Sequence, residues 1–146
     1  MELIPCSHAE ADRLPLDLTR DERIFKLYFL DIGLLLCILR LDYLTLISEM
    51  DRLTTSRGVI TEQFVAQTLA SIYGQVTVPM LNYWLRDKGS QKGEVDFLIQ
   101  EKDEVIPIEV KAGQSGKLKS LFYFAHEKKW SNAVKISLEW RFQGHR

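Results

Sequence analysis

The sequence has little of what marks secreted, zinc-binding or membrane-spanning proteins. Its two cysteines, Cys6 and Cys37, have no CxxC neighbour, which favours a reducing, cytoplasmic setting without a disulfide framework. The three histidines are scattered, and no pair of them has the spacing of a zinc site. The most apolar stretch, 33–39, has seven residues, whereas a helix that crosses a membrane needs about 20. No signal-peptide pattern opens the chain.

A strong excess of either charge is also missing. The 19 basic and 20 acidic residues give a net charge of −1, which excludes a protein that is basic all over and coats nucleic acid. The charges are nevertheless uneven. Residues 1–73 hold 7 basic and 11 acidic groups, net −4, and residues 74–146 hold 12 and 9, net +3. Any anionic partner is therefore expected to meet the second half of the chain.

The pattern of apolar residues, which make up 46% of the chain, predicts one α/β domain. The segments expected to form strands are 3–4, 25–30, 80–86, 95–100, 105–111 and 133–138. The segments expected to form helices are 32–39, 61–73 and 117–129. Asp31 is the expected N-cap of the first helix. The last helix should bury one face, made by Leu118, Leu121, Phe122 and Ala125. This order predicts a central mixed sheet flanked by helices.

The most informative segment is the predicted hairpin around the short polar connection 101–104. This loop length pairs Gln100 with Val105 and Leu98 with Pro107. On this register, one face of the hairpin is wholly apolar and carries Val95, Phe97, Ile99, Ile106, Ile108 and Val110. Pro107 cannot donate a backbone hydrogen bond, which by itself indicates an edge strand.

The other face of this hairpin carries Asp96, Glu109 and Lys111. Carboxylates directly opposite each other repel, and a divalent cation between them turns that repulsion into binding. Lys111 could position or deprotonate an attacking water, or stabilise a pentavalent phosphate. Glu62 could point to the same place from the 61–73 helix, or could only complement the dipole of that helix. A register slip of one residue would separate Asp96 from Glu109.

These segments also resemble a known superfamily. Residues 93–99 (GEVDFLI), followed by 108–111 (IEVK), resemble the core of the PD-(D/E)XK nucleases, which include restriction endonucleases and archaeal Holliday-junction resolvases. The resemblance implies a restriction-endonuclease-like fold that cleaves DNA with Mg²⁺ or Mn²⁺. The residues that it implies are Glu62, Asp96 and Glu109 as metal ligands, with Lys111 as the catalytic lysine.

A second resemblance covers nearly the whole chain. It is carried, in this order, by residues 26–35, 62–67, 83–87, 93–99 and 106–113. This succession is similar to the uncharacterised domain that follows the ATPase in many prokaryotic AAA+ proteins. It implies that 1–25 are the remnant of a winged-helix-like linker and that 26–146 are a nuclease-like domain, shortened after about Leu138. The chain has no GxxxxGK[ST] phosphate loop, so an AAA+ ATPase is expected as a partner.

Two questions stay open at this level. The side chains that could contact phosphates are Lys88, Lys92, Gln114 and Lys117, although solvated loop residues would have the same composition. The alternative to a nuclease is a catalytically inactive module of the same fold that binds nucleic acid or a protein partner. A third possibility is a truncated gene product without an independent role.

Overall fold

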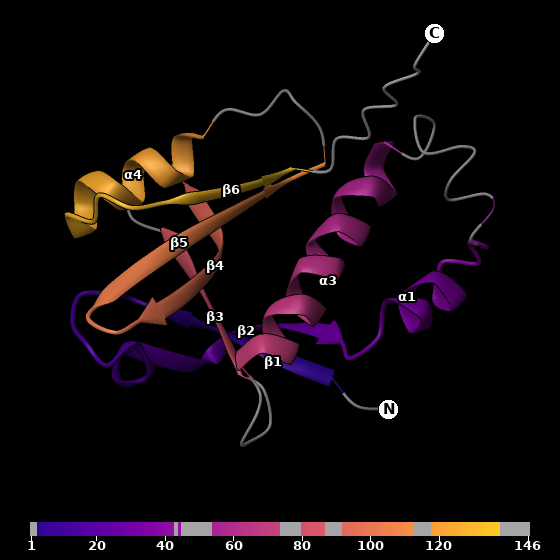
Figure 1. Ribbon diagram of the computed structural model, residues 1–146, viewed down its shortest axis with the longest axis horizontal. Helices are drawn as coiled ribbons and strands as arrows, with labels where there is room; N and C mark the ends of the chain where they lie inside the picture. Colours follow the sequence, from indigo (N-terminus) through magenta and orange to yellow (C-terminus); the bar gives the residue numbers. More distant parts are fainter. Residues whose placement is uncertain are drawn as a thin grey trace, which may run out of the picture.

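The computed structural model describes residues 3–42, 44, 54–73, 80–86, 92–112 and 118–137 (Figure 1). Its strands are β1 (Leu3–Ala9), β2 (Arg20–Phe29), β3 (Leu81–Arg86), β4 (Gly93–Glu101), β5 (Glu104–Lys111) and β6 (Val134–Ser137). Its helices are the short 3₁₀ helix η1 (Leu16–Thr19) and the α-helices α1 (Ile32–Ile38), α3 (Thr54–Tyr73) and α4 (Lys119–Lys128).

The described strands form one mixed sheet in the order β2-β1-β3-β4-β5-β6. Neighbouring strands are antiparallel except for β1 with β3 and β5 with β6, which are parallel. The predicted α/β class with a central mixed sheet is therefore confirmed. Residues 3–9 hydrogen-bond directly to β3 and 20–29 form the strand beyond them, so much of 1–25 belongs to this sheet. The proposed origin of 1–25 as a linker remnant stays a prediction.

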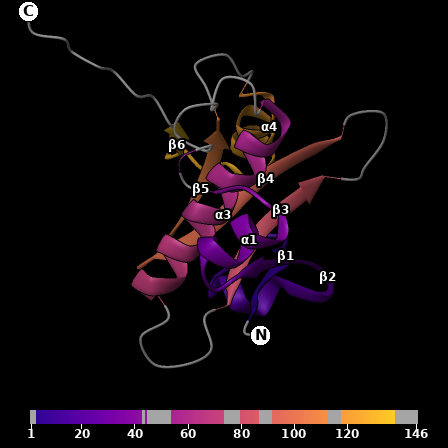
Figure 2. The ribbon, with the colours of Figure 1, turned by 90° about the vertical axis from the view of Figure 1, so that its right-hand side faces the viewer.

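Helices cover both faces of the sheet, each over its own apolar cluster (Figures 1 and 2). On one face, α3 packs Val65, Ala66, Leu69 and Ala70 against Phe97, Ile108 and Val110. On the other face, α4 packs Leu121 and Phe124 against Trp84, Val95 and Leu98. Because these side chains leave water, the two clusters supply the main favourable free energy of the fold.

The register of the β4–β5 hairpin agrees with the sequence prediction, because Gln100 pairs with Val105 and Leu98 with Pro107. The prediction that Val95 shares a face with Phe97 was wrong, since Val95 packs in the α4 cluster and Phe97 in the α3 cluster. The cause is an irregularity in the pairing of β3 with β4. Asn82 pairs with Leu98 but Trp84 pairs with Val95, so one extra residue of β4 lies between these pairs.

Pro107 lies inside the sheet, yet its missing donor costs no ladder hydrogen bond. The pairing of β6 with β5 begins only at Ile108, opposite Val134. At Pro107 the strand has a partner on one side alone, which is the β4 residue Leu98. The proline therefore occupies a local edge position within an interior strand, as its chemistry requires.

Two other expectations need adjustment, and one is confirmed. Helix α3 begins at Thr54, seven residues before the predicted start at 61. In α4, Phe122 is 71% exposed and Phe124 is fully buried, so the predicted apolar face was wrong at Phe122. The predicted cap is confirmed, because the Asp31 side chain accepts a hydrogen bond from the Gly33 backbone at 2.7 Å.

Among the described residues, no helix has the length and apolarity that crossing a bilayer requires.

Candidate functional site

Three carboxylates converge on the face of the sheet that α3 covers. They belong to Glu62 of α3 and to Glu94 and Asp96 of β4, and one oxygen from each lies within 4.8 Å of the others. Glu62 is one helical turn before Val65 and Ala66, which are buried against the sheet. The same helical stripe therefore turns Glu62 toward β4. Of the described residues, these are the ones grouped closely enough to hold a metal ion with three acidic or histidine ligands.

Two side chains from β2 hold this carboxylate cluster, which is defined as Glu62, Glu94 and Asp96. The Lys26 ammonium donates to Glu62 at 3.2 Å and also forms a close ion pair with Glu94. The Tyr28 hydroxyl donates to the same Glu62 oxygen, Oε1. Burial and the Glu62 charge raise the pKa of Tyr28, so this hydroxyl stays a hydrogen-bond donor. Glu62 is thus held against the sheet by two side chains of β2, and its carboxylate does more than complement the helix dipole.

Asp96 occupies the point where the hairpin ladder stops. The last pair on this side is Phe97 with Ile108, and Asp96 Oδ2 accepts the backbone N–H of Val110 at 2.7 Å. The pKa of Asp96 is raised to about 7, mainly by burial and also by the charges of Glu109 and Glu62, against the opposing effects of the Val110 hydrogen bond and of Lys26. A carboxyl group with this pKa is easily protonated in the absence of a cation.

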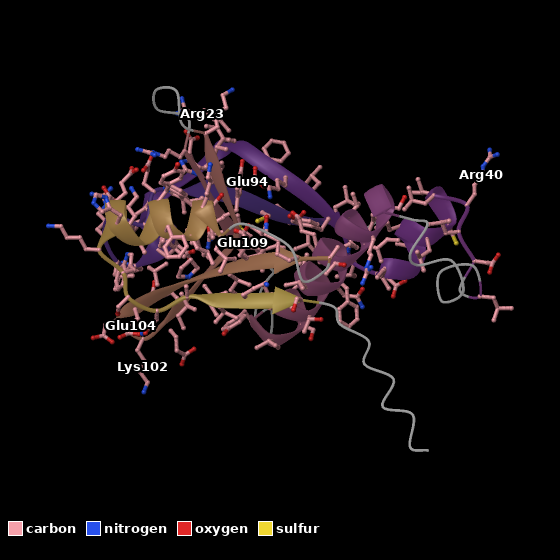
Figure 3. All side chains as sticks on the ribbon, turned by 90° about the horizontal axis from the view of Figure 1, so that it is seen from above. Arg23, Arg40, Glu94, Lys102, Glu104 and Glu109 are labelled. Carbon is pink, nitrogen blue, oxygen red and sulfur yellow. The ribbon has the colours of Figure 1, made fainter. Side chains whose placement is uncertain are left out.

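Glu109 is almost fully buried and forms a second acidic centre next to Asp96. Its Oε1 accepts from the Lys111 ammonium in a close ion pair. Its Oε2 is buried, and no hydrogen-bond partner for it lies among the residues that the structure describes. Figure 3 shows Glu94 and Glu109 near the middle of the view, whereas Lys102 and Glu104 lie at the edge of the molecule. An unsatisfied buried carboxylate oxygen is costly, and a bound cation would satisfy it.

The structure thus brings together part of the residue set predicted from the sequence. Glu62 and Asp96 meet, and Lys111 meets Glu109, but Glu109 lies outside the three-carboxylate group. Glu109 follows Ile108 and precedes Val110, which both pack toward α3, so strand alternation turns its side chain away from α3. Of the predicted phosphate contacts, Lys88, Gln114 and Lys117 lie outside the described residues, and Lys92 is exposed.

Glu94 and Lys26 are site residues that sequence reasoning missed. Glu94 directly precedes the predicted strand and is two residues from Asp96, so strand alternation could have revealed it. Lys26 is 36 residues from Glu62 in the chain, and no spacing links the two. Only the placement of β2 beside β1 brings Lys26 to the cluster.

A cavity of about 290 Å³ adjoins the cluster between β2, α1 and α3. Lys26, Tyr28 and Glu62 line one part of it, and Leu35, Val59 and Gln63 line the rest. This space is large enough to admit several water molecules. The cluster therefore has solvent next to it while its carboxylates remain partly buried.

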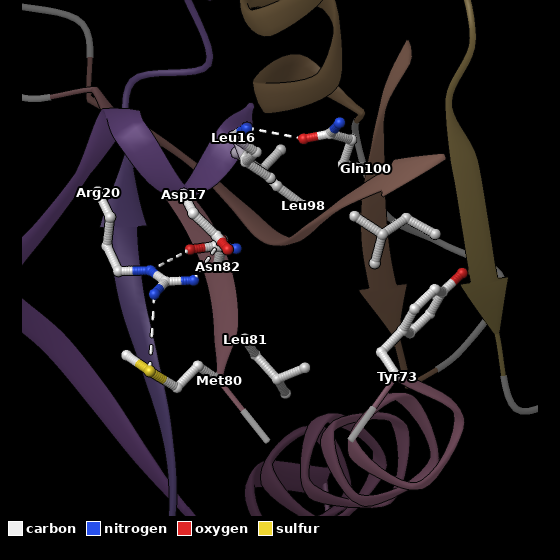
Figure 4. Close-up of a pocket in the computed structure, with 10 residues that line it drawn as sticks. Leu16, Asp17, Arg20, Tyr73, Met80, Leu81, Asn82, Leu98 and Gln100 are labelled. Carbon is white, nitrogen blue, oxygen red and sulfur yellow. Dashed lines mark hydrogen bonds and ion pairs between the residues drawn. The ribbon is translucent and has the colours of Figure 1, made fainter. Parts of the chain in front are cut away.

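A second cavity, of about 310 Å³, lies elsewhere, near the start of β3 (Figure 4). Its Arg20 guanidinium donates to Asn82 at 2.9 Å and to Asp17 at 2.5 Å. Gln100 accepts from the Leu16 backbone at 2.7 Å and donates to a backbone carbonyl in the hairpin turn. These polar groups already satisfy one another, and their hydrogen bonds tie η1 to the sheet. This cavity is therefore a weaker candidate for a catalytic or binding site.

The comparisons with known proteins place the chain in a family. The model of DUF4143, described as a domain of unknown function, matches residues 57–141. This match covers more than half of the chain. The chain belongs to the DUF4143 family. The matched range includes Glu62, Glu94, Asp96, Glu109 and Lys111, whereas Lys26 and Tyr28 precede it. Neither the curated proteins nor the solved structures gave a significant match.

Proposed function

We propose that this DUF4143 domain is a divalent-metal-dependent DNA endonuclease of the PD-(D/E)XK type that works with an AAA+ ATPase. The observation that carries the proposal is the convergence of Glu62, Glu94 and Asp96, with oxygens within 4.8 Å of one another. Ionised carboxylates this close to one another repel, which costs folding free energy, and a bound divalent cation offsets this repulsion.

The donor set suits a hard cation. Mg²⁺ binds oxygen ligands at about 2.0–2.1 Å, so two of its ligands lie about 3 to 4 Å apart. The three oxygens lie within 4.8 Å of one another, so small movements of the side chains would bring them to such spacings. The buried Oε2 of Glu109 is a further oxygen that has no hydrogen-bond donor among the described residues, although Lys111 pairs with the other oxygen of this carboxylate. The residues present therefore fit Mg²⁺ or Mn²⁺.

Each side chain has a role in this proposal. Glu62, Glu94 and Asp96 would hold the ion, and Glu109 could join them as a ligand only if its side chain moved from its place beside Lys111. Lys111 keeps its ammonium at Glu109, from where it can orient a water molecule or neutralise charge that develops on a phosphate. When bound, the ion supplies Lewis-acid activation of a phosphate and of water.

Plasmid nicking in Mg²⁺ or Mn²⁺ tests the proposal. We expect the wild type to convert supercoiled DNA to open circles, and we expect Asp96→Asn and Lys111→Ala to lower the rate by a factor of about 100 or more. Glu101→Gln is the matched control, since Glu101 is an exposed carboxylate at the end of the same strand. Equal nicking by all four proteins would indicate a contaminant and would contradict the assigned roles.

A second candidate is a catalytically inactive module that binds a protein partner, such as an AAA+ ATPase. The exposed apolar side chains of the edge strand β2 favour it, because Phe25 and Leu27 are 54% and 53% exposed. This candidate predicts metal binding without DNA cleavage. It also predicts that Phe25→Lys weakens association with such an ATPase and leaves the folding of the domain intact.

A further inference from the structure

Lys26 is the feature of this site that the proposed function leaves without a role. Its ammonium bridges Glu62 and Glu94, two of the three carboxylates in the cluster. It also lies 4.7 Å from the centre of the Tyr83 ring, over the face of the ring. Burial lowers the pKa of Lys26, but the charges of Glu62 and Glu94 outweigh burial and raise it. A positive charge is therefore already present in the carboxylate cluster.

The charges of the site show that the Lys26 ammonium alone does not neutralise the carboxylates. When all are ionised, Glu62, Glu94, Asp96 and Glu109 carry −4, and Lys26 and Lys111 together carry +2. The remaining −2 equals the charge that one divalent ion would neutralise. Lys26 donates to the Oε1 atom of Glu62, which also accepts from Tyr28, so this oxygen is fully engaged.

Two independent observations indicate that the site is built for more than an internal ion pair. The Glu109 side chain is 4% exposed, and its Oε2 has no partner among the described residues. The 290 Å³ cavity lined by Lys26 and Glu62 provides space into which the ammonium can withdraw. The side chain of Lys26 is 23% exposed, so this path leads toward water.

We infer that Lys26 is an internal cation that occupies the carboxylate cluster and competes with a divalent metal ion for Glu62 and Glu94. This inference rests on the metal-binding part of the proposed function. In the metal-free protein, Lys26 stabilises the fold by neutralising two partly buried carboxylates. For metal to bind, the ammonium must leave them, and the free energy of that separation weakens the observed metal affinity.

Titration of Mn²⁺ into the full chain, followed by calorimetry, tests the inference. Lys26→Met removes the charge and keeps an apolar side chain of similar length for the Tyr83 ring. We expect it to bind Mn²⁺ about tenfold more tightly than the wild type, or tighter still, and to unfold at a lower temperature without metal. Lys119→Met is the matched control, because Lys119 is an exposed lysine on α4, and we expect wild-type affinity from it.

A measurement on the wild type avoids dependence on the folding of the variant. In metal-free buffer, Lys26 should react slowly with an amine-acetylating reagent, and saturating Mg²⁺ should increase its acetylation, read by mass spectrometry, while Lys119 stays unchanged. A wild type that binds Mn²⁺, together with unchanged or weaker binding by Lys26→Met, would overturn this inference and leave the proposed metal site standing. Protection of Lys26 by Mg²⁺ would also overturn it. No binding by either protein would overturn both.

Discussion

Replacing Asp96 with asparagine should stabilise the metal-free protein at alkaline pH. Burial, with help from Glu109 and Glu62, raises the pKa of Asp96 from 3.8 to about 7 in the fold. Because the folded-state pKa lies above the unfolded value, the folded protein retains a proton that the unfolded chain loses between these two pH values. Stability therefore falls as pH rises through that window, and the full penalty is present above it.

The size of the effect follows from the same two values. A change in pKa from 3.8 to about 7 corresponds to roughly 4 kcal/mol. Because Asp96 is only partly buried and water screens its charge, we expect about 2 kcal/mol. Asparagine cannot ionise, yet it keeps an oxygen that can accept the Val110 N–H. For a domain of this size, the gain corresponds to a rise of about 6 °C in Tm.

Thermal unfolding in EDTA at pH 4, 6 and 8 measures this directly. The advantage of Asp96→Asn over the wild type should be near zero at pH 4 and largest at pH 8. Glu101→Gln, which changes an exposed carboxylate of the same strand, should show little change at any pH. A variant that is less stable than the wild type at pH 8, or equally stabilised at every pH, would refute the burial argument.

Two further perturbations probe the surroundings of the site. Lys111→Met should destabilise the protein by about 3 kcal/mol, because it leaves the buried Glu109 carboxylate without its ion-pair partner. Urea unfolding at pH 7 would show this, and recovery in the double variant with Glu109→Gln would confirm the cause, whereas strictly additive losses would argue against it. Asp31→Ala should cost about 1 kcal/mol through loss of the α1 cap. Asp31→Ser should restore most of this in the same assay, and equal losses in both variants would exclude capping as the reason.

Features set by neighbouring residues could be predicted from the sequence. The four-residue connection 101–104 predicted the pairing of Gln100 with Val105, and Asp31 before an apolar run predicted a helix cap. The helical stripe that Glu62 shares with Val65 and Ala66 allowed it to point inward, although a role at the helix dipole alone was the other possibility. These inferences depend on turn length and helical period, which act over a few residues.

Features set by distant strands could not be predicted in this way. The position of Val95 depends on the irregular pairing of β4 with β3, and alternation along β4 alone contains no sign of it. Lys26 belongs to β2, which β1 separates from β3 and β4 in the sheet, and no sequence spacing indicates that it reaches Glu62 and Glu94. The choice of Phe124 over Phe122 as the core residue of α4 depends on where that helix lies on the sheet. Tertiary packing decides each of these cases.

Binding of a divalent ion to the carboxylate cluster is the central claim, and calorimetric titration of Mn²⁺ into the metal-free protein tests it most directly. We predict one saturable site for each chain in the wild type, and its loss in Asp96→Asn. Equal binding by the wild type and by Asp96→Asn, or no saturable binding by the wild type, would contradict the claim.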